Sequence, residues 1–285
     1  MLQQQVQDGW RSPWSAAEPM TIDYSFVGVD SSWRNGAQPN VQTRDLGLAE
    51  ASRGLMGAQH RRAVGKRGSN SGEWLRPDLD FRFVYVLKGS LAIENELGGR
   101  HVLWPAAVAL HGPSLSYAEI DMSGDLELIE ITAPANATTV LNRDAPRLPR
   151  QAPVGGVRRA EYLHETADSY VVGAGPRRYF AYRDLGTADF TRRRIHIHVV
   201  KALEPMPGGT GWHNHTMSQL FVVLQGWADL VVEGHGERRM HAGDAMCLRA
   251  GMRHDVPAYS ADYKVLEMCI PADYDTAATE APASA

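Results

Sequence analysis

Three histidines and a glutamine in the C-terminal half have the residue types and the spacing of a metal site. His213 and His215 are two residues apart, so on a β-strand both rings leave the same face. Gln219 follows four residues later, an even step that on one unbroken strand would point its amide the same way. His254 follows a turn at Gly251. Three imidazoles and an amide oxygen suit a divalent transition metal, because imidazole binds Zn, Cu, Fe and Ni and the carbonyl oxygen is a harder donor.

The segments that must position these residues have the pattern of β-strands. The apolar runs LFVVL and ADLVV flank Gly226, which predicts a hairpin turn at that glycine. Elsewhere the chain has short apolar segments, often alternating with polar residues and separated by turn sequences such as NELGGRH and EGHGERR. No long segment has a convincing helical period. The sequence therefore predicts an all-β protein.

Three pairs of segments recur along the chain. VYVLKGSLAIEN matches VVLQGWADLVVE, and SGDLELIEITAPA matches SADYKVLEMCIPA, both with an offset of 137 residues. RDLG at 44–47 recurs at 183–186, with an offset that differs by two. These repeats predict a tandem duplication of one all-β unit with few insertions.

The ordered set of residues in the second copy resembles the two motifs of the cupin superfamily. The first motif is a His-x-His pair, a Glu or Gln and a later Gly; the second is a Gly-Asp pair, a strand, a turn and a His. The residues that match are His213, His215, Gln219, Gly226, Gly243, Asp244, Gly251 and His254. The departures are Gln219 in place of the commoner Glu, and Ala250 where Pro is usual.

This resemblance implies two tandem cupin barrels, each a double-sheet jelly roll. We expect an N-terminal arm at 1–25, a first barrel at 26–141, a linker at 142–162, a second barrel at 163–274 and a disordered tail at 275–285. Trp10 and Trp14 should pack on the body of the protein or on a partner subunit. Because cupins often dimerise through strand exchange, for which this arm could serve, we predict a homodimer.

The offset between the copies tests whether both hold metal ligands. It places Arg82 at the position of Gln219, Tyr117 at that of His254, and the segment WLRPD at 74–78 at the His-x-His pair. The first barrel is therefore predicted to lack a metal site. Arg82 would put a fixed cation where a metal would otherwise lie.

Other residues of the second copy are candidates for roles beside the metal. His196 and His198 share one strand face, and we predict that they point into the cavity as catalytic groups that support the ligands or contact substrate. The alternative is an exposed strand face beside the preceding arginines. Phe221 and Val223 have the parity of the glutamine ligand and should line the substrate pocket together with Trp212.

Two further side chains are interpreted as structural. Glu267 matches Glu130 of the first copy, and a glutamate that is present where the metal ligands are absent is more typical of scaffold than of a catalytic base. Cys247 lies on the strand before the second motif without an identifiable activating base, so we interpret it as a buried, inert thiol.

Four protein ligands on a divalent ion leave one or two positions for water, substrate or dioxygen. Because Gln219 is neutral, the site should favour an anionic bidentate ligand such as an enolate, phenolate or carboxylate. With Fe(II), the first choice, the resemblance implies a dioxygenase for a small phenolic, enol or dicarbonyl compound. With Zn or Ni it implies a redox-neutral cyclase, isomerase or lyase, and Mn also suits the ligands. A non-catalytic barrel that uses one metal per chain to bind a small molecule is the third alternative.

Composition and net charge limit the classes of protein to which this chain can belong. Apolar residues make up 44% and charged residues 22% of the 285, which is ordinary for a soluble globular protein. A net charge of −4 and the lack of a long basic block argue against nucleic-acid binding. Two cysteines provide no disulfide framework, and neither a secretory signal nor a membrane-spanning run is recognisable. We therefore expect a cytoplasmic protein without membrane or nucleic-acid partners.

Overall fold

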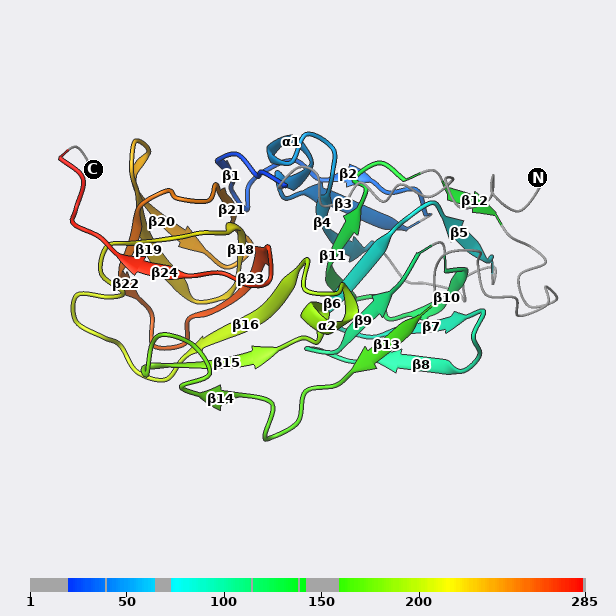
Figure 1. Ribbon diagram of the computed structural model, residues 1–285. Helices are drawn as coiled ribbons and strands as arrows, with labels where there is room; N and C mark the ends of the chain where they lie inside the picture. Colours follow the sequence, from blue (N-terminus) through cyan, green and yellow to red (C-terminus); the bar gives the residue numbers. More distant parts are fainter. Residues whose placement is uncertain are drawn as a thin grey trace, which may run out of the picture. The chain divides into compact units, whose positions relative to one another are not determined.

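The computed structural model describes residues 20–38, 40–64, 73–113, 115–137, 139–141 and 159–283 (Figure 1). Within these ranges the regular structure is almost entirely β, and the two α-helices, α1 (Leu48–Ala51) and α2 (Thr187–Phe190), have four residues each. The all-β prediction is confirmed. Trp10, Trp14 and most of the expected linker lie outside the described residues. None of the described helices is long and apolar enough to cross a membrane.

The chain forms two compact units, each with a seven-stranded and a five-stranded antiparallel sheet. Unit 1 comprises the described residues of Ser32–Asp45 and Gly54–Glu165. Its seven-stranded sheet has the order β13, β9, β6, β11, β4, β3, β2, and its five-stranded sheet has the order β12, β5, β10, β7, β8. These strands are β2 (Arg34–Asn35), β3 (Val41–Asp45), β4 (Gly57–Ala63), β5 (Leu75–Pro77), β6 (Phe81–Lys88), β7 (Leu91–Asn95), β8 (Arg100–Leu103), β9 (Val108–His111), β10 (Tyr117–Met122), β11 (Glu127–Ala133), β12 (Thr139–Leu141) and β13 (Ala160–Leu163).

Unit 2 comprises the described residues of Met20–Ser31, Leu46–Arg53 and Thr166–Ala285. Its seven-stranded sheet has the order β1, β21, β18, β23, β16, β15, β14, and its five-stranded sheet has the order β20, β19, β22, β17, β24. These strands are β1 (Ser25–Val27), β14 (Val171–Val172), β15 (Phe180–Asp184), β16 (His196–Ala202), β17 (His213–His215), β18 (Ser218–Gln225), β19 (Trp227–Val232), β20 (Gly236–His241), β21 (Ala245–Leu248), β22 (His254–Tyr259), β23 (Lys264–Ile270) and β24 (Thr276–Ala278).

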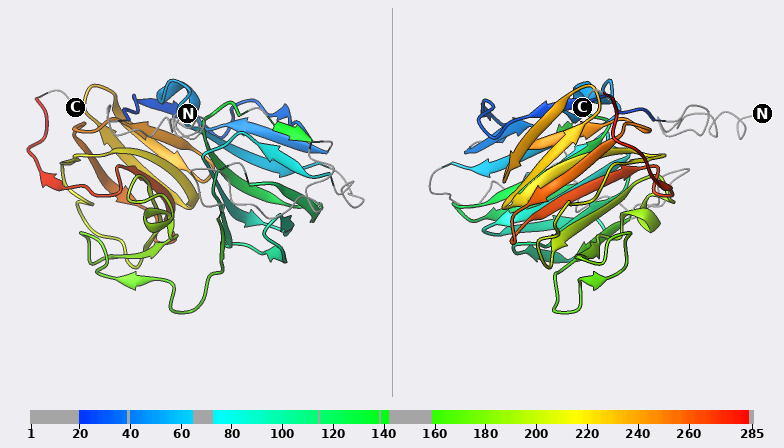
Figure 2. Two further views of the ribbon diagram at one scale, coloured as in Figure 1. Left: turned by 45° about the vertical axis from the view of Figure 1, so that its right-hand side comes forward. Right: turned by 90° about the vertical axis from the view of Figure 1, so that its left-hand side faces the viewer.

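The two units repeat one topology, as the internal repeats predict. In each larger sheet the central strands, β6, β11 and β4 in unit 1 and β18, β23 and β16 in unit 2, lie side by side in the same order (Figure 2). The register repeats too, because Arg82 pairs with His111 as Gln219 pairs with Leu248, in agreement with the offset of 137 residues. Each unit is a double-sheet jelly roll whose apolar core lies inside the unit.

The glycine turns between β18 and β19 and between β6 and β7 do not close hairpins. β18 belongs to the seven-stranded sheet and β19 to the five-stranded sheet, and the two strands do not pair. The hairpin predicted at Gly226 is therefore wrong, although the turn itself is present with φ of 68°. Gly89, with φ of 70°, makes the same change of sheet in unit 1. Only glycine adopts this conformation readily, which explains why both copies have it.

The edge strands correct the expected domain boundaries. β1, at the junction of the expected arm and first barrel, pairs with β21 of unit 2, and β13, in the expected linker, pairs with β9 of unit 1. Ser25, the last residue of the expected arm, thus pairs within its own chain. The expected disordered tail is wrong for residues 276–278, because β24 pairs with β17. In each case an otherwise open sheet edge gains main-chain hydrogen bonds, and segments of three or four residues are too short for the sequence pattern to predict them.

Candidate metal centre

The predicted ligands come from both sheets of unit 2. His213 and His215 lie on β17 of the five-stranded sheet, where His213 pairs with His254 of β22. Gln219 lies on β18 of the seven-stranded sheet, beyond a break at residues 216–217. The expectation of one unbroken strand is therefore wrong. The four side chains still line one cavity, because the inner faces of two sheets converge on the interior of a jelly roll.

The three histidines form a compact cluster. Single ring nitrogens of His213, His215 and His254 all lie within 4.8 Å of one another. The ring centroids of His213 and His254 are 4.3 Å apart, and those of His215 and His254 are 5.3 Å apart. His213 and His254 are buried, with 7% and 2% of their surfaces exposed. The structure thus brings together the imidazoles that the sequence singled out.

Hydrogen bonds determine which ring nitrogen each histidine offers. Nδ1 of His213 lies 2.6 Å from the carbonyl oxygen of Gly211, and Nδ1 of His254 lies 3.1 Å from that of Met252. A carbonyl oxygen only accepts, so each Nδ1 carries the proton and donates it. The lone pair of Nε2 is then available to a metal in both rings. This is the usual way in which proteins orient histidine ligands.

His215 is also hydrogen-bonded at Nδ1, here by a hydroxyl group, which can either accept the proton of Nδ1 or donate its own. Its Nδ1 lies 2.8 Å from Oγ1 of Thr276, a residue of β24. The pKa values of the three imidazoles also favour the neutral, metal-binding form. Burial is the main cause, and it lowers the pKa of His254 to about 3, that of His215 to about 4, and that of His213 to a lesser extent. The donor set therefore fits a divalent metal ion.

Glu267 links the predicted glutamine ligand to one of the predicted catalytic histidines. Nε2 of Gln219 donates to Oε1 of Glu267 at 2.5 Å, and Oε2 of Glu267 lies 3.0 Å from Nε2 of His198. Because the amide nitrogen is engaged, the amide oxygen of Gln219 is the atom that remains for a metal. Burial would raise the pKa of Glu267, but hydrogen bonding and charge interactions with His198, His215 and Gln219 outweigh it and lower that pKa to about 2.

The ligands face a cavity of about 90 Å³. Of the residues predicted beside the metal, Phe221 and His198 line this cavity. Trp212 and Val223 are not among its lining residues, contrary to the prediction. Trp212 immediately precedes His213, so its side chain leaves the opposite side of the chain, and Val223 is packed in the apolar core. His196 lines a separate, open hollow.

Several cavity residues were not predicted from the sequence. Arg177, in the loop before β15, lines the cavity and its positive charge contributes to the lowered pKa values of His213 and His215, and Tyr182 and Tyr274 line the cavity as well. Apolar side chains such as Phe180 and Val265 complete the lining. These residues come from segments up to about a hundred positions apart, and no local motif marks them.

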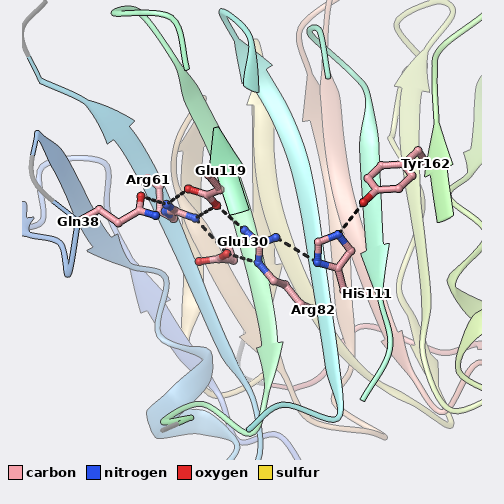
Figure 3. A network of polar contacts seen from close by, with 7 residues as sticks. All are labelled: Gln38, Arg61, Arg82, His111, Glu119, Glu130 and Tyr162. Atoms are coloured by element: carbon pink, nitrogen blue, oxygen red, sulfur yellow. Dashed lines mark hydrogen bonds and ion pairs between the residues drawn. The ribbon is translucent and has the colours of Figure 1, made fainter. Parts of the chain in front are cut away.

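The corresponding interior of unit 1 holds a buried network of ion pairs (Figure 3). Arg82 donates from Nη2 to Glu119 and from Nε to Glu130, each at 2.7 Å. Arg61 donates to the same two carboxylates at 2.9 to 3.1 Å. The guanidinium of Arg82 lies 4.2 Å from the ring centroid of Tyr117. A fixed cation thus occupies the position aligned with Gln219, as predicted.

The network continues to the edge of the sheet. Nη1 of Arg82 lies 3.4 Å from Nδ1 of His111, and Nε2 of that histidine lies 3.2 Å from the hydroxyl group of Tyr162 on β13 (Figure 3). Glu130 accepts from Arg82 as Glu267 accepts from Gln219, so the matched glutamates hold equivalent neighbours in the two units. Within the described residues, the clusters of three or more metal-ligand side chains all lie in unit 2.

Comparison with known proteins agrees with this fold. Residues 201–269 match the family model of the cupin domain. No curated protein matches the chain significantly. A glyoxylate-induced protein from Pseudomonas aeruginosa superimposes with a TM-score of 0.60 at 14% identity, covering 96% of this chain and 97% of that one. A point mutant of Bacillus subtilis oxalate decarboxylase gives 0.62 at 13% identity, covering 90% and 80%.

Solved structures with this fold include both oxalate decarboxylases and an 11S globulin. Lactobacillus farciminis oxalate decarboxylase, in complex with formate, gives a TM-score of 0.62 at 11% identity and covers 93% of this chain and 89% of that one. Procruciferin, an 11S globulin from Brassica napus, gives 0.63 at 10% identity, covering 90% and 86%. The fold is thus that of cupin jelly rolls, and unit 2 contains the segment that matches the cupin-domain model together with a histidine-rich candidate metal centre. A shared fold at such identities does not assign an activity.

Proposed function

We propose that the protein is a mononuclear metal-dependent enzyme that acts on a small anionic oxygenated compound in the cavity of unit 2. The proposed ligands are His213, His215, Gln219 and His254. The observation that carries this proposal is the cluster of three imidazoles that are all hydrogen-bonded at Nδ1, which in His213 and His254 leaves the Nε2 lone pair available. A histidine needed only for packing does not require this common orientation.

The cavity limits the class of substrate. A volume of about 90 Å³ has room for several water molecules or one compound with few heavy atoms. The guanidinium of Arg177 and a cation held by neutral protein ligands both favour an anion. A small carboxylate, enolate or dicarbonyl compound satisfies these conditions, and a large aromatic compound does not fit.

Each side chain of the site has a role in this proposal. A metal held here would supply Lewis acidity and open positions for substrate and, if it is Fe(II), for dioxygen. Glu267 and His198 hold the amide of Gln219 in one orientation. Arg177 pairs with the substrate anion, and Phe180, with its neighbours in the wall, excludes water. His196 lies outside this cavity, so we assign it no step of this reaction.

The first reaction that we propose is dioxygenase-type oxidation on Fe(II). A redox-neutral lyase reaction on another divalent metal is the second candidate. It is supported by the small cavity and by solved structures of this fold that are named oxalate decarboxylases, one of which is described as having Mn(II) centres. The bound metal distinguishes the two.

Elemental analysis of untagged protein, purified without added metal, tests the site. We expect about one metal ion at this centre in the wild type, its loss in His254→Ala, and its retention in His241→Ala, which removes an exposed histidine outside the cluster. An unchanged number of metal ions per chain in His254→Ala would sink the proposed centre. Wild-type protein that neither contains nor takes up metal would do so as well.

Turnover assays then test the activity. Protein that contains Fe(II) should consume dioxygen in the presence of small dicarbonyl or carboxylate compounds, and Arg177→Met should raise KM for them. Protein that contains Mn, Zn or Ni should cleave or isomerise such compounds without dioxygen uptake. Calorimetry tests whether the metal-loaded protein binds a small anion. Binding without any turnover would contradict the enzyme proposal and support a metal-assisted binding protein. The homodimer remains a prediction that sedimentation analysis can check.

A further inference from the structure

A second group of ligand-type side chains lies in unit 2 and is distinct from the four proposed catalytic ligands, although one of its members, His198, also lines their cavity. His196 and His198 are on β16, and Cys269 is on the adjacent strand β23, where it is the direct partner of His196. One ligand atom from each of the three residues lies within 4.8 Å of the others. The rings of the two histidines have centroids 4.6 Å apart. The three side chains therefore converge on one point beside the sheet.

One atom in this group is left without a hydrogen-bonding partner. Nε2 of His198 is hydrogen-bonded to the carboxylate of Glu267. An ionised carboxylate has no proton to donate, so Nε2 carries the proton of this hydrogen bond. The lone pair is then on Nδ1. His198 is 4% exposed, and within the described structure its Nδ1 is buried and has no hydrogen-bonding partner. A buried acceptor of this kind is costly, and such groups in native proteins call for a partner.

The orientation of His198 is that of a metal ligand held by a carboxylate. In carboxylate–histidine–metal arrangements, the carboxylate binds one ring nitrogen and thereby presents the lone pair of the other nitrogen to the ion. Glu267 provides the carboxylate here, and Nδ1 is the presented atom. This differs from His213 and His254, in which Nδ1 is hydrogen-bonded and Nε2 is presented.

The chemistry of the three donors selects the ion. Two imidazoles and a thiolate suit Zn²⁺, which is held by nitrogen and sulfur in tetrahedral sites with Zn–N near 2.0 Å and Zn–S near 2.3 Å, so that ligand atoms lie about 3 to 4 Å apart. The ligand atoms lie within 4.8 Å of one another in the present structure, so metal binding would have to draw them closer. The thiol of Cys269 hydrogen-bonds to Tyr274 and Glu267, and metal binding would replace its proton.

An ion can reach this group from solvent. His196 is partly exposed and lines an open hollow of about 540 Å³ together with Asp184, Asp273 and Tyr274. Oδ1 of Asp184 lies 3.8 Å from Nε2 of His196, so either this carboxylate or a water molecule can complete a tetrahedral site.

The three donors are not required by the scaffold. In unit 1 the strand register places Gly57 and Gln59 at the positions of His196 and His198, and Thr132 at the position of Cys269. The same sheet therefore forms with none of these ligands. Their joint presence in unit 2 calls for a reason other than strand pairing.

We propose that His196, Nδ1 of His198 and Sγ of Cys269 form a second metal site, which takes a thiophilic divalent cation of the Zn²⁺ type. This site is separate from the proposed catalytic ligands and contains the one thiolate in either set. It does not depend on the proposed function, because its donors and its spectroscopic signature are its own.

Titration of the metal-free full-length protein with Co²⁺ tests the proposal, because a cobalt–thiolate bond absorbs in the near ultraviolet and cobalt bound by imidazole and amide alone does not. We expect a sulfur-to-cobalt band in the wild type and its loss in Cys269→Ser. Cys247→Ser, which removes the other buried cysteine, should keep the band. Elemental analysis after Zn²⁺ loading should give two ions per chain in the wild type and one in Cys269→Ser.

Two further variants separate the sites and guard against misfolding. His254→Ala should lose the first ion and keep the cobalt–thiolate band, so failure of the catalytic centre alone leaves this proposal intact. His196→Ala changes a partly exposed side chain and should weaken cobalt binding at the thiolate at least tenfold with the circular dichroism spectrum unchanged. Absence of the band in folded wild-type protein, or its persistence in Cys269→Ser, would overturn the second site.

Discussion

At the scale of single residues, the histidines of unit 2 differ in which nitrogen they present. His213, His215 and His254 are hydrogen-bonded at Nδ1, whereas His198 is hydrogen-bonded at Nε2. Because a neutral imidazole has one proton and one lone pair, the carbonyl contacts of His213 and His254 and the carboxylate contact of His198 determine which nitrogen is the donor to a metal. Two adjacent sites of different chemistry can therefore be built from one residue type.

Thr276→Val tests this reasoning at His215. The substitution removes the hydroxyl group that lies 2.8 Å from Nδ1, so the ring loses the contact that orients it. We expect the affinity of the catalytic centre for Fe(II) to fall roughly tenfold or more, as for other contacts that support a ligand. Competition with a metal-binding dye measures this affinity.

Thr279→Val is the control for this change. Oγ1 of Thr279 is buried and has no hydrogen-bonding partner within the described structure, so its removal should leave the affinity unchanged. Equal affinities for both variants and the wild type would show that Thr276 does not orient His215.

At the scale of elements, the turn that carries the chain from β18 to β19 depends on the absence of a side chain. A Cβ atom added to Gly226 would lie 2.1 Å from Oγ of Ser260, which is held by its hydrogen bond from the amide of Trp227. Gly234 has a similar φ of 77°, but an added Cβ would meet nothing within 4 Å. Alanine substitutions at the two glycines therefore allow the cost of backbone strain to be measured separately from the cost of steric overlap.

We therefore expect Gly226→Ala to destabilise unit 2 more than Gly234→Ala. The backbone conformation alone costs about 1 to 2 kcal/mol for alanine at either position. At Gly226, displacement of Ser260 should add about 1 to 3 kcal/mol. Urea unfolding measures both values, and a similar loss for the two variants would contradict a steric role of Ser260.

The elements also show how far the sequence could be interpreted. The spacing of His213, His215 and His254 between apolar runs was enough to predict their convergence, and the repeats predicted two all-β units. The sheet to which each strand belongs was not predictable, because an apolar run does not reveal its partner. The hairpin at Gly226 and the single strand from His213 to Gln219 were wrong for this reason.

Contacts between residues far apart in sequence were beyond prediction for the same reason. Glu119 binds Arg61 and Arg82, which are 58 and 37 positions away, and no local pattern identifies such partners. Arg177 lies in a loop 36 residues before His213, and its place in the cavity follows only from the fold. The glutamates matched across the repeat were a usable signal. Glu130 binds Arg82 and Glu267 binds Gln219, and these two partners are themselves aligned across the repeat.

At the scale of the whole molecule, the two units have the same sheet topology and different interiors. Unit 2 holds neutral imidazoles, whereas unit 1 holds two arginines and two glutamates in a buried network. Buried ion pairs contribute little compared with apolar packing, but loss of one partner is costly because a charge is left uncompensated. The stability of unit 1 should therefore depend on pH through Glu119.

The sign of this dependence follows from the pKa of Glu119. Burial opposes its charge, but Arg61 and Arg82 outweigh burial and lower the pKa from 4.5 to about 2. A carboxylate with a lowered pKa stabilises the fold above its unfolded pKa, and this contribution is lost as pH falls from about 4.5 to about 2. At about 1.4 kcal/mol per pKa unit, the loss is on the order of 3 kcal/mol.

Glu119→Gln should thus destabilise the protein by about 3 kcal/mol at pH 7 and remove the part of the acid dependence that Glu119 contributes, so that stability falls less steeply between pH 7 and pH 3 than in the wild type. Urea unfolding at pH 7 and at pH 3, followed by a probe in unit 1, measures both effects.

Glu73→Gln, which changes an exposed glutamate of the same unit, should leave the acid dependence as in the wild type. The metal content of unit 2 should be the same in both variants, because the described ligands of each candidate site come from unit 2 alone. An unaltered acid dependence in Glu119→Gln would show that the network of unit 1 does not control its stability.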